Sequence, residues 1–130
     1  MAEIFKINIE IREQQEKLLL KIPESTKVPV GSIVQWNIIG LDKHYNNPPL
    51  HWTKGLIFTL YFSDGSPFRW RRQFVQLQHD PRFFPYYSNK IVRLAEDIAY
   101  ETGNYKYGVK VTDAESDETL FDEDPYLIVF

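Results

Sequence analysis

The stretch Gly103-Asn104-Tyr105-Lys106-Tyr107-Gly108-Val109-Lys110-Val111 alternates between large apolar residues and polar or small ones. Successive side chains of an extended chain point to opposite faces, so this alternation is typical of a β-strand with one buried face. That face would carry Tyr105, Tyr107, Val109 and Val111. A turn-forming Thr102-Gly103-Asn104 precedes the stretch, and an acidic, polar run follows it. We therefore predict a long central strand of an all-β sandwich.

The same alternation recurs along the rest of the chain, at residues 5–11, 18–22, 34–38 and 56–62. The first two of these segments are expected to pair as a hairpin, and Trp36 is expected to be a core residue. Shorter apolar runs at 91–94 and 126–130 predict further strands, the last with Phe130 packed. Residues 96–101 fit either one helical turn or extended chain.

No helix longer than two turns and no internal repeat is expected. About seven or eight short strands separated by turn residues favour an antiparallel Greek-key β-sandwich, either cupredoxin-like or immunoglobulin-like. The 130 residues fit a single domain, residues 1–130. A chain of this length buries roughly 65–70% of its unfolded surface, which is enough for a core of its own.

The composition excludes several kinds of chemistry. The chain has no cysteine, which rules out disulfides, zinc–thiolate sites, iron–sulfur clusters and cysteine nucleophiles. The first residues lack the basic and apolar segments of a secretory signal, and no apolar stretch approaches the ~20 residues of a membrane span. We therefore expect a cytoplasmic protein with no membrane partner.

The charge is unevenly distributed. Residues 113–124 contain seven of the 18 acidic residues and none of the 15 lysines and arginines. We interpret this run as the solvated tip of an acidic hairpin. Its start, Asp113 to Asp117, resembles a calcium loop, but Glu118 stands where the sharp turn of such a loop needs glycine. Nucleic acid is not an expected partner, because a nucleic-acid binder usually has a strongly basic face.

Three segments together resemble the cupredoxins, the plastocyanin and azurin type of sandwich. Residues Pro29 to Trp36 resemble the family's P-x-G-x-x-V-x-W strand, and Thr102 to Tyr107 resemble the P-G-x-Y-x-Y strand before the copper loop. Leu127 to Val129 fit the terminal strand. The phrases Ser63 to Phe68 and Asp124 to Val129 are also similar to bacterial proteins related to that fold. These anchors cover about a quarter of the chain.

The resemblance does not extend to the copper ligands. A cupredoxin copper is held by two histidines, a cysteine thiolate and usually a weak axial methionine. His44 stands roughly where the first histidine would be, but Val109 stands in place of the cysteine. Thr112 and Asp117 stand near the positions of the second histidine and the methionine. The resemblance therefore implies the scaffold without blue copper, and we expect no cofactor and no metal site, also not at His44 with His51.

Candidate contact residues lie in three places. Arg69, Trp70, Arg71 and Arg72 form a basic-aromatic run, and arginine and tryptophan are enriched among interface hot spots. The alternative is that Trp70 packs inward while the arginines meet the acids of 113–124. The long loops 40–54 and 79–90 carry Trp52, Tyr86 and Tyr87, which suit a platform for a sugar or a protein, or a cap over one end of the sandwich.

No catalytic motif stands out. The chain has no Gly-x-Ser-x-Gly elbow and no glycine-rich phosphate loop, so we predict no catalytic residues and no enzyme. The function expected is a non-catalytic, copper-free binding or interaction module. Its partner would be another protein or a second copy, met through a sheet edge or face. The alternatives are a carbohydrate- or small-ligand-binding domain that uses Trp52, Trp70, Tyr86 and Tyr87, and an unrecognised hydrolase.

Overall fold

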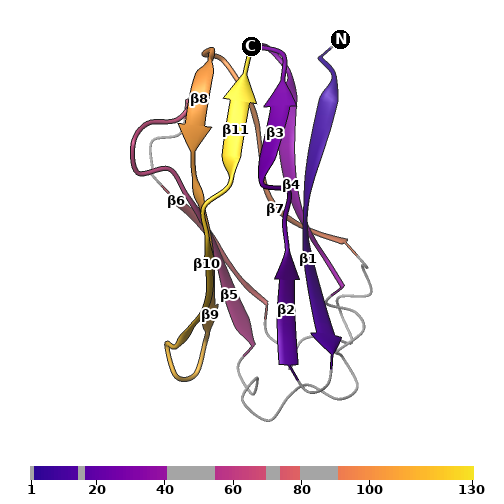
Figure 1. Cartoon of the computed structure of the whole chain (residues 1–130), viewed down its shortest axis with the longest axis vertical. Helices are drawn as coiled ribbons and strands as arrows, with labels where there is room; N and C mark the ends of the chain where they lie inside the picture. The colour runs from indigo at the N-terminus through magenta and orange to yellow at the C-terminus, as the bar shows by residue number, and fades with distance from the viewer. Residues whose placement is uncertain (1, 15–16, 41–54, 70–73, 80–90) are drawn as a thin grey trace.

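The chain forms eleven β-strands and no helix in the part described by the computed structural model, which comprises residues 2–14, 17–40, 55–69, 74–79 and 91–130 (Figure 1). The strands are β1 (Ile4–Gln14), β2 (Lys17–Lys21), β3 (Ser25–Val28), β4 (Ile33–Ile39), β5 (Leu56–Tyr61), β6 (Phe74–His79), β7 (Ile91–Ile98), β8 (Gly103–Lys106), β9 (Gly108–Asp113), β10 (Thr119–Glu123) and β11 (Tyr126–Val129). The all-β prediction is confirmed, with more strands than the seven or eight expected.

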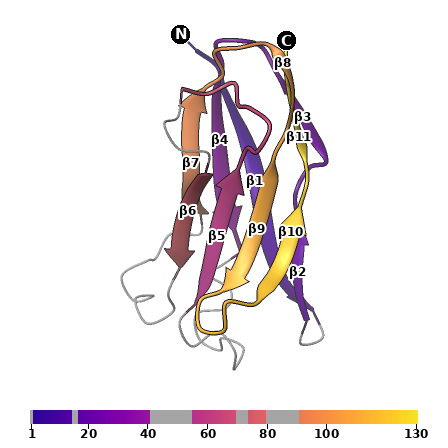
Figure 2. The same ribbon diagram turned by 90° about the vertical axis from the view of Figure 1, so that its left-hand side faces the viewer.

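Two four-stranded sheets form the sandwich, in the orders β2-β1-β4-β7 and β10-β9-β5-β6. Figure 2 shows β5, β9 and β10 in front of β1 and β4. A smaller sheet, β3-β11-β8, lies at the end of the molecule where the C-terminus is found (Figure 1). The expected β1–β2 hairpin is present, but β1 pairs with β4, and β3 with β11, in parallel.

The strand order differs from that of an immunoglobulin domain. There the first strand lies at the edge of its sheet, whereas here β1 lies between β2 and β4. The connections β4–β5 and β6–β7 each pass from one large sheet to the other, and β7 leads through β8 of the small sheet to β9. Of the two sandwich types expected, the immunoglobulin-like order is therefore not the one observed.

The strand predicted over Gly103–Val111 is divided at Tyr107, so the expectation of one continuous strand is wrong. β8 pairs with β11, whereas β9 pairs with β5 and β10. The backbone N–H of Tyr107 donates to the carbonyl of Pro125 over 3.0 Å, so both strands of this long hairpin change sheet at the same level. The face prediction is confirmed for Tyr107, Val109 and Val111, which are buried, whereas Tyr105 is only partly buried.

An aromatic cluster occupies the space between the sheets. The Trp36 ring meets Phe62, Phe68 and Tyr107 edge-on, at centroid distances of 6.2, 5.5 and 5.6 Å. The rings of Phe62 and Tyr107 stack at 5.2 Å. Such pairs add about 0.5–1.5 kcal/mol each to the hydrophobic stabilisation. The core role expected for Trp36 is confirmed.

The structure contradicts one expectation, for Phe130, and decides between the two that the sequence left open for residues 96–101. Residues 96–101 do not form a helical turn, since β7 continues to Ile98 and Ala99 exchanges backbone hydrogen bonds with Gly31 and Ser32. The expectation that Phe130 is packed is wrong, because its side chain is 63% exposed. Only its backbone is held, by Val28 and Val30. The apolar character of residues 126–130 did not indicate that Phe130, one residue beyond the last strand, lies outside the core.

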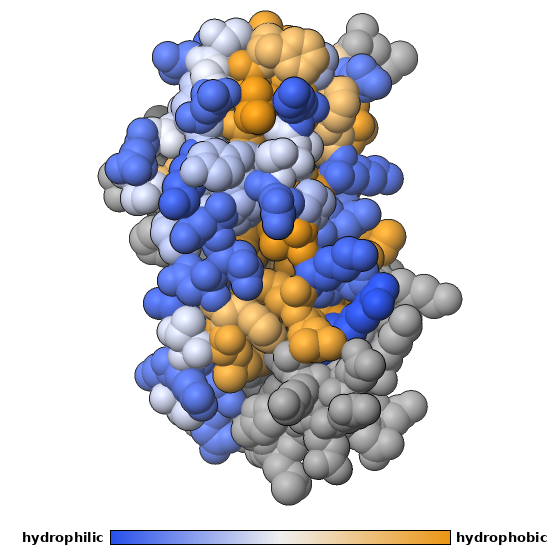
Figure 3. Space-filling model, in the orientation of Figure 1, coloured by the Kyte–Doolittle hydropathy of each residue, from blue (hydrophilic) through white to orange (hydrophobic). Residues whose placement is uncertain are grey.

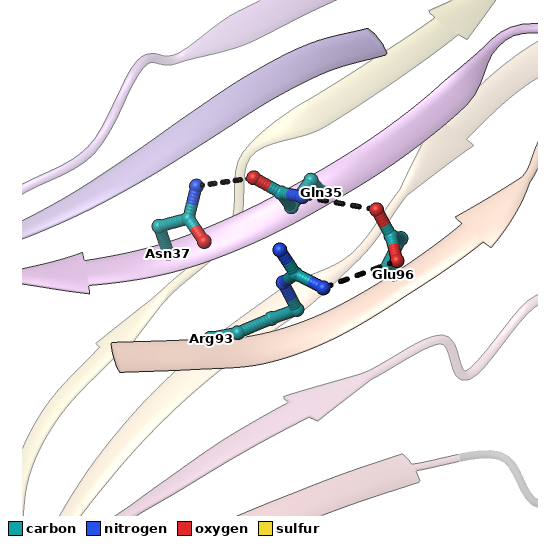
Figure 4. Close-up of polar contacts among 4 residues, drawn as sticks. All are labelled: Gln35, Asn37, Arg93 and Glu96. Carbon is teal, nitrogen blue, oxygen red and sulfur yellow. Dashed lines mark hydrogen bonds and ion pairs between the residues drawn. The ribbon is translucent and has the colours of Figure 1, made fainter. Parts of the chain in front are cut away.

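The outer face of β4 carries a chain of buried amides that the alternation pattern did not predict (Figure 4). Gln35 and Asn37 are only 5% and 3% exposed. Asn37 Nδ2 donates to Gln35 Oε1, and Gln35 Nε2 donates to Glu96 Oε1, each over 2.9 Å. Arg93 then pairs with Glu96 over 3.3 Å. This is a connected polar network on a face for which the sequence pattern made no prediction.

A β-bulge in β7 brings the two charged members of this network together. Trp36 lies opposite Ala95 but Asn37 lies opposite Arg93, so Leu94 is an extra residue in the ladder. As a result, the consecutive residues Leu94 and Ala95 are both buried. The bulge also places Arg93 and Glu96 on the same outer face, although they are three residues apart.

We predict that Gln35→Leu lowers the free energy of unfolding by about 1–3 kcal/mol. The substitution leaves the buried Asn37 amide without its acceptor and Glu96 without its buried donor. Urea unfolding would measure the change. Asn8→Leu, which alters an exposed residue on the same sheet face, is the matched control and should stay within about 0.5 kcal/mol of the wild type. Equal effects of the two variants would contradict a special role of the network.

We predict that Tyr107 makes the protein sensitive to alkaline pH. Burial raises the pKa of Tyr107 from 10.0 to about 12, and the neighbouring indole N–H of Trp36 lowers it only in part. Between these two values the unfolded state loses the phenolic proton while the folded state keeps it, so the free energy of unfolding falls as pH rises. In Tyr107→Phe, urea unfolding from pH 9 to 12 should show a loss smaller by up to about 2 kcal/mol. Parallel losses in both proteins would refute the assignment.

Candidate functional site

The basic-aromatic run predicted as a contact patch is described only at its first residue. Arg69 is exposed, and its guanidinium carbon lies 3.9 Å from the ring centroid of Tyr100, in a cation–π contact. Trp52, Trp70, Arg71, Arg72, Tyr86 and Tyr87 lie outside the described residues, and so do His44 and His51. Their predicted roles stay predictions.

The acidic run spans the turn of the β9–β10 hairpin and β10 itself. The hairpin is confirmed, but the expected solvation is wrong for Asp113, which shapes the turn. Asp113 is 2% exposed, and its Oδ1 accepts the backbone N–H of Glu115 over 2.9 Å. Asp117 adopts a left-handed backbone conformation with φ of 60°, which aspartate tolerates in turns. Among the described residues, no group of three or more histidine, aspartate or glutamate side chains is arranged to hold a metal ion.

One hollow lies where the two sheets separate at one edge of the sandwich. The parallel pair β3–β11 joins the two sides at one end, and beyond it β2 and β10 are the edge strands of different sheets. A groove of about 590 Å³ lies at this fork. We call it the fork groove, and it is lined by Ile22, Glu24, Ser25, Asp122, Glu123, Asp124, Pro125 and Tyr126.

The fork groove is strongly acidic. Glu24 faces it from one side, and the consecutive residues Asp122, Glu123 and Asp124 from the other. In the described part of the chain, no lysine or arginine lies within ion-pair distance of these four carboxylates. Four carboxylates around one hollow, none of them in an ion pair with a described lysine or arginine, create a negative potential that attracts cationic groups.

Apolar side chains accompany these carboxylates. Leu20, Ile22, Leu120 and Phe121 are partly buried against the core, on the two edge strands and next to them. Figure 3, which views this edge, shows hydrophobic residues exposed between hydrophilic ones. Tyr126 is 45% exposed, and the Lys106 ammonium lies 6.0 Å from its ring centroid. The edge therefore combines charge with an apolar surface.

Asp122 is fixed in place by Tyr61. The Tyr61 hydroxyl donates to Asp122 Oδ1 over 2.7 Å. This hydrogen bond, with smaller contributions from burial and from the charges of Asp122 and Asp124, raises the pKa of Tyr61 to about 12. The phenol therefore remains a donor also at alkaline pH, where an ordinary tyrosine begins to ionise, and it engages one oxygen of the carboxylate.

The sequence did not reveal the fork groove because its two sides are far apart in the chain. Asp122, Glu123 and Asp124 were assigned to the hairpin tip, although they belong to the sheet change beside Pro125. Glu24 stands next to Pro23, which also lies at a sheet change. The sequence signal for this groove was a pair of prolines, Pro23 and Pro125, each of which ends the pairing of one strand before the chain enters another sheet.

Comparisons with known proteins give a distant structural likeness only. No family model and no curated protein matches the chain. Among solved structures, the chain is similar to Fet3p, a multicopper oxidase that functions in iron import, at 5% identity and a TM-score of 0.49. The match covers 98% of this chain but 28% of the Fet3p chain. Within the described residues, no helix has the length and apolar character of a membrane span.

We predict that Asp122→Asn brings the pKa of Tyr61 down towards its ordinary value. The substitution removes the charge that strengthens the hydrogen bond from the phenol. The titration of a ¹³C label at Tyr61 Cζ, followed by NMR, would measure the change. Asp124→Asn, which removes a more weakly acting charge, should shift the pKa less. If the two variants shift it equally, the hydrogen bond is not the main cause.

Proposed function

We propose that the chain is a non-catalytic binding module that receives a basic, extended segment of a partner protein in the fork groove. The observation that carries this proposal is the set of four carboxylates around the groove, none with a cationic partner among the described residues. Complementary charge favours a lysine- or arginine-containing partner and repels an acidic one.

The free strand edges favour an extended partner. Among the described strands, β2 and β10 each pair with a neighbour on one side, and the other side offers the backbone N–H and C=O groups of a sheet edge. An extended peptide forms its main-chain hydrogen bonds with such an edge and places alternate side chains in the adjoining pockets. Leu20, Leu120 and Phe121 would accept its apolar side chains while the carboxylates accept its basic ones.

The scaffold proposed for this module is a cupredoxin-like sandwich without blue copper. At the position that corresponds to the cysteine ligand, Val109 is completely buried in the core. Hydrocarbon at this place supports packing and offers no ligand. The functional surfaces are then the sheet edges and outer faces.

The other functions expected from the sequence remain open as predictions. Sugar binding through Trp52, Trp70, Tyr86 and Tyr87 and a contact through Arg71 and Arg72 involve residues outside the described part. The hydrolase and the cytoplasmic location likewise stay predictions. Self-association competes directly with the proposal, because a second copy could occupy the same groove.

The proposal predicts that a labelled peptide of alternating lysine and valine binds and that a glutamate–valine peptide does not. In fluorescence anisotropy, the combination Glu24→Gln, Glu123→Gln and Asp124→Asn should weaken lysine–valine binding at least about tenfold. The three substituted carboxylates line the groove, so their loss removes the attraction. Added salt should weaken binding by the wild type, because it screens exposed charges.

The matched control removes the same charge at the hairpin tip, through Glu115→Gln, Asp117→Asn and Glu118→Gln. This control should leave binding within about threefold, since the tip lies outside the groove. An equal loss in both triple variants would show unspecific attraction and overturn the proposal. Analytical ultracentrifugation supplies a second check. A dimer that dissociates in the groove variant would assign the groove to a second copy and also overturn it.

A further inference from the structure

A second hollow lies on the exposed face of the β10-β9-β5-β6 sheet. It has a volume of about 350 Å³ and is lined by Thr59, Tyr61, Gln76, Lys110, Thr112 and Asp122. Four of these residues form one row across the whole sheet. Thr59 on β5 lies opposite both Gln76 on β6 and Lys110 on β9, and Lys110 lies opposite Asp122 on β10. Strands lie ~4.8 Å apart, so the row offers polar groups at regular intervals.

Tyr61 stands beside this row as a fixed aromatic surface. It lies opposite Gly108 on β9, and a Cβ atom at Gly108 would occupy the space that the Tyr61 ring fills. Glycine is therefore required there, since it lets the ring pack directly on the neighbouring backbone. The hydrogen bond from its hydroxyl to Asp122 holds the other end of the side chain. A ring held in this way loses little conformational entropy when a ligand binds.

The polar groups of the hollow supply both donors and acceptors with no net charge. The charges of Lys110 and Asp122 have opposite sign. Gln76 Nε2 donates to Thr59 Oγ1 over 3.1 Å, which leaves the Gln76 carbonyl as an acceptor, while Thr59 itself is only 9% exposed. The hydroxyl of Thr112 can act in either way. A ligand that matches this set carries several neutral hydroxyl groups.

We propose that this hollow binds a neutral saccharide. Its hydroxyls would pair with Gln76, Lys110 and Thr112, and the C–H face of a sugar ring would lie against Tyr61. A phosphate or carboxylate is disfavoured because Asp122 faces Lys110, and a purely apolar ligand would leave the polar row unpaired. The proposal goes beyond the fork groove and requires none of the loop aromatics.

The experiment is a screen of an array of neutral and acidic glycans, followed by ¹⁵N NMR titration with cellohexaose, xylohexaose and maltohexaose. We expect binding of neutral glycans, with shifts concentrated in β5, β6, β9 and β10. Tyr61→Ala should weaken binding at least about tenfold, because it removes the aromatic surface. A second variant, Gln76→Ala, removes an exposed side chain of the hollow. It should weaken binding about threefold or more without disturbing the core.

Two controls separate this site from the fork groove. Tyr126→Ala removes an exposed tyrosine that does not line the hollow, and it should leave glycan binding unchanged. The triple groove variant (Glu24→Gln, Glu123→Gln, Asp124→Asn) should lose the lysine–valine peptide but retain the glycan. Absence of binding to neutral glycans, binding of acidic glycans alone, or binding unaffected by both Tyr61→Ala and Gln76→Ala would overturn the proposal.

Discussion

The hydrogen bond from the Tyr107 N–H to the Pro125 carbonyl marks the constraint on which much of the architecture depends. At this level both strands of the last hairpin leave one large sheet and enter the small one. Pro125 has no N–H to continue an antiparallel ladder, so a break there is favourable. Because β11 then pairs with β3 while β10, among the described strands, pairs with β9 alone, the edges of the sandwich are joined at one end and separate beyond it. The fork groove is a direct consequence of this break.

The two faces of β4 are both buried, but one packs in the apolar core and the other carries a polar network. Trp36 anchors the aromatic core, while Gln35 and Asn37 on the other side are almost equally buried. Their burial is tolerated because each amide has a partner, and because the bulge in β7 brings Arg93 and Glu96 to the same face. Alternation of apolar and polar residues therefore identified the core face correctly but gave no measure of how deeply the polar face lies.

Tyr61 and Asp122 connect the two surfaces for which we propose ligands. Asp122 lines both the fork groove and the hollow on the sheet face, and Tyr61 reaches it only because Gly108 leaves room for the ring. An exposed carboxylate is ordinarily mobile, but here one oxygen is held by a phenol whose pKa is raised to about 12. The two surfaces are therefore contiguous on the molecule, and they differ in chemistry. The groove is anionic and partly apolar, whereas the hollow carries balanced charge and neutral hydrogen-bonding groups.

The sequence by itself determined the all-β class, the β1–β2 hairpin, the acidic turn and the inward faces of β1, β4, β5 and β9. These features depend on the period of two residues in a strand and on local turn chemistry, both of which are visible in consecutive residues. Only the tertiary structure decided the division at Tyr107, the parallel pairing of β1 with β4, the bulge at Leu94, and the meeting of Glu24 with Asp122 to Asp124. Pairing between distant segments leaves no periodic signal, because its register is set by the packing of the whole core. The candidate sites belong to this second class, since each is assembled from strands that are neighbours in space and distant along the chain.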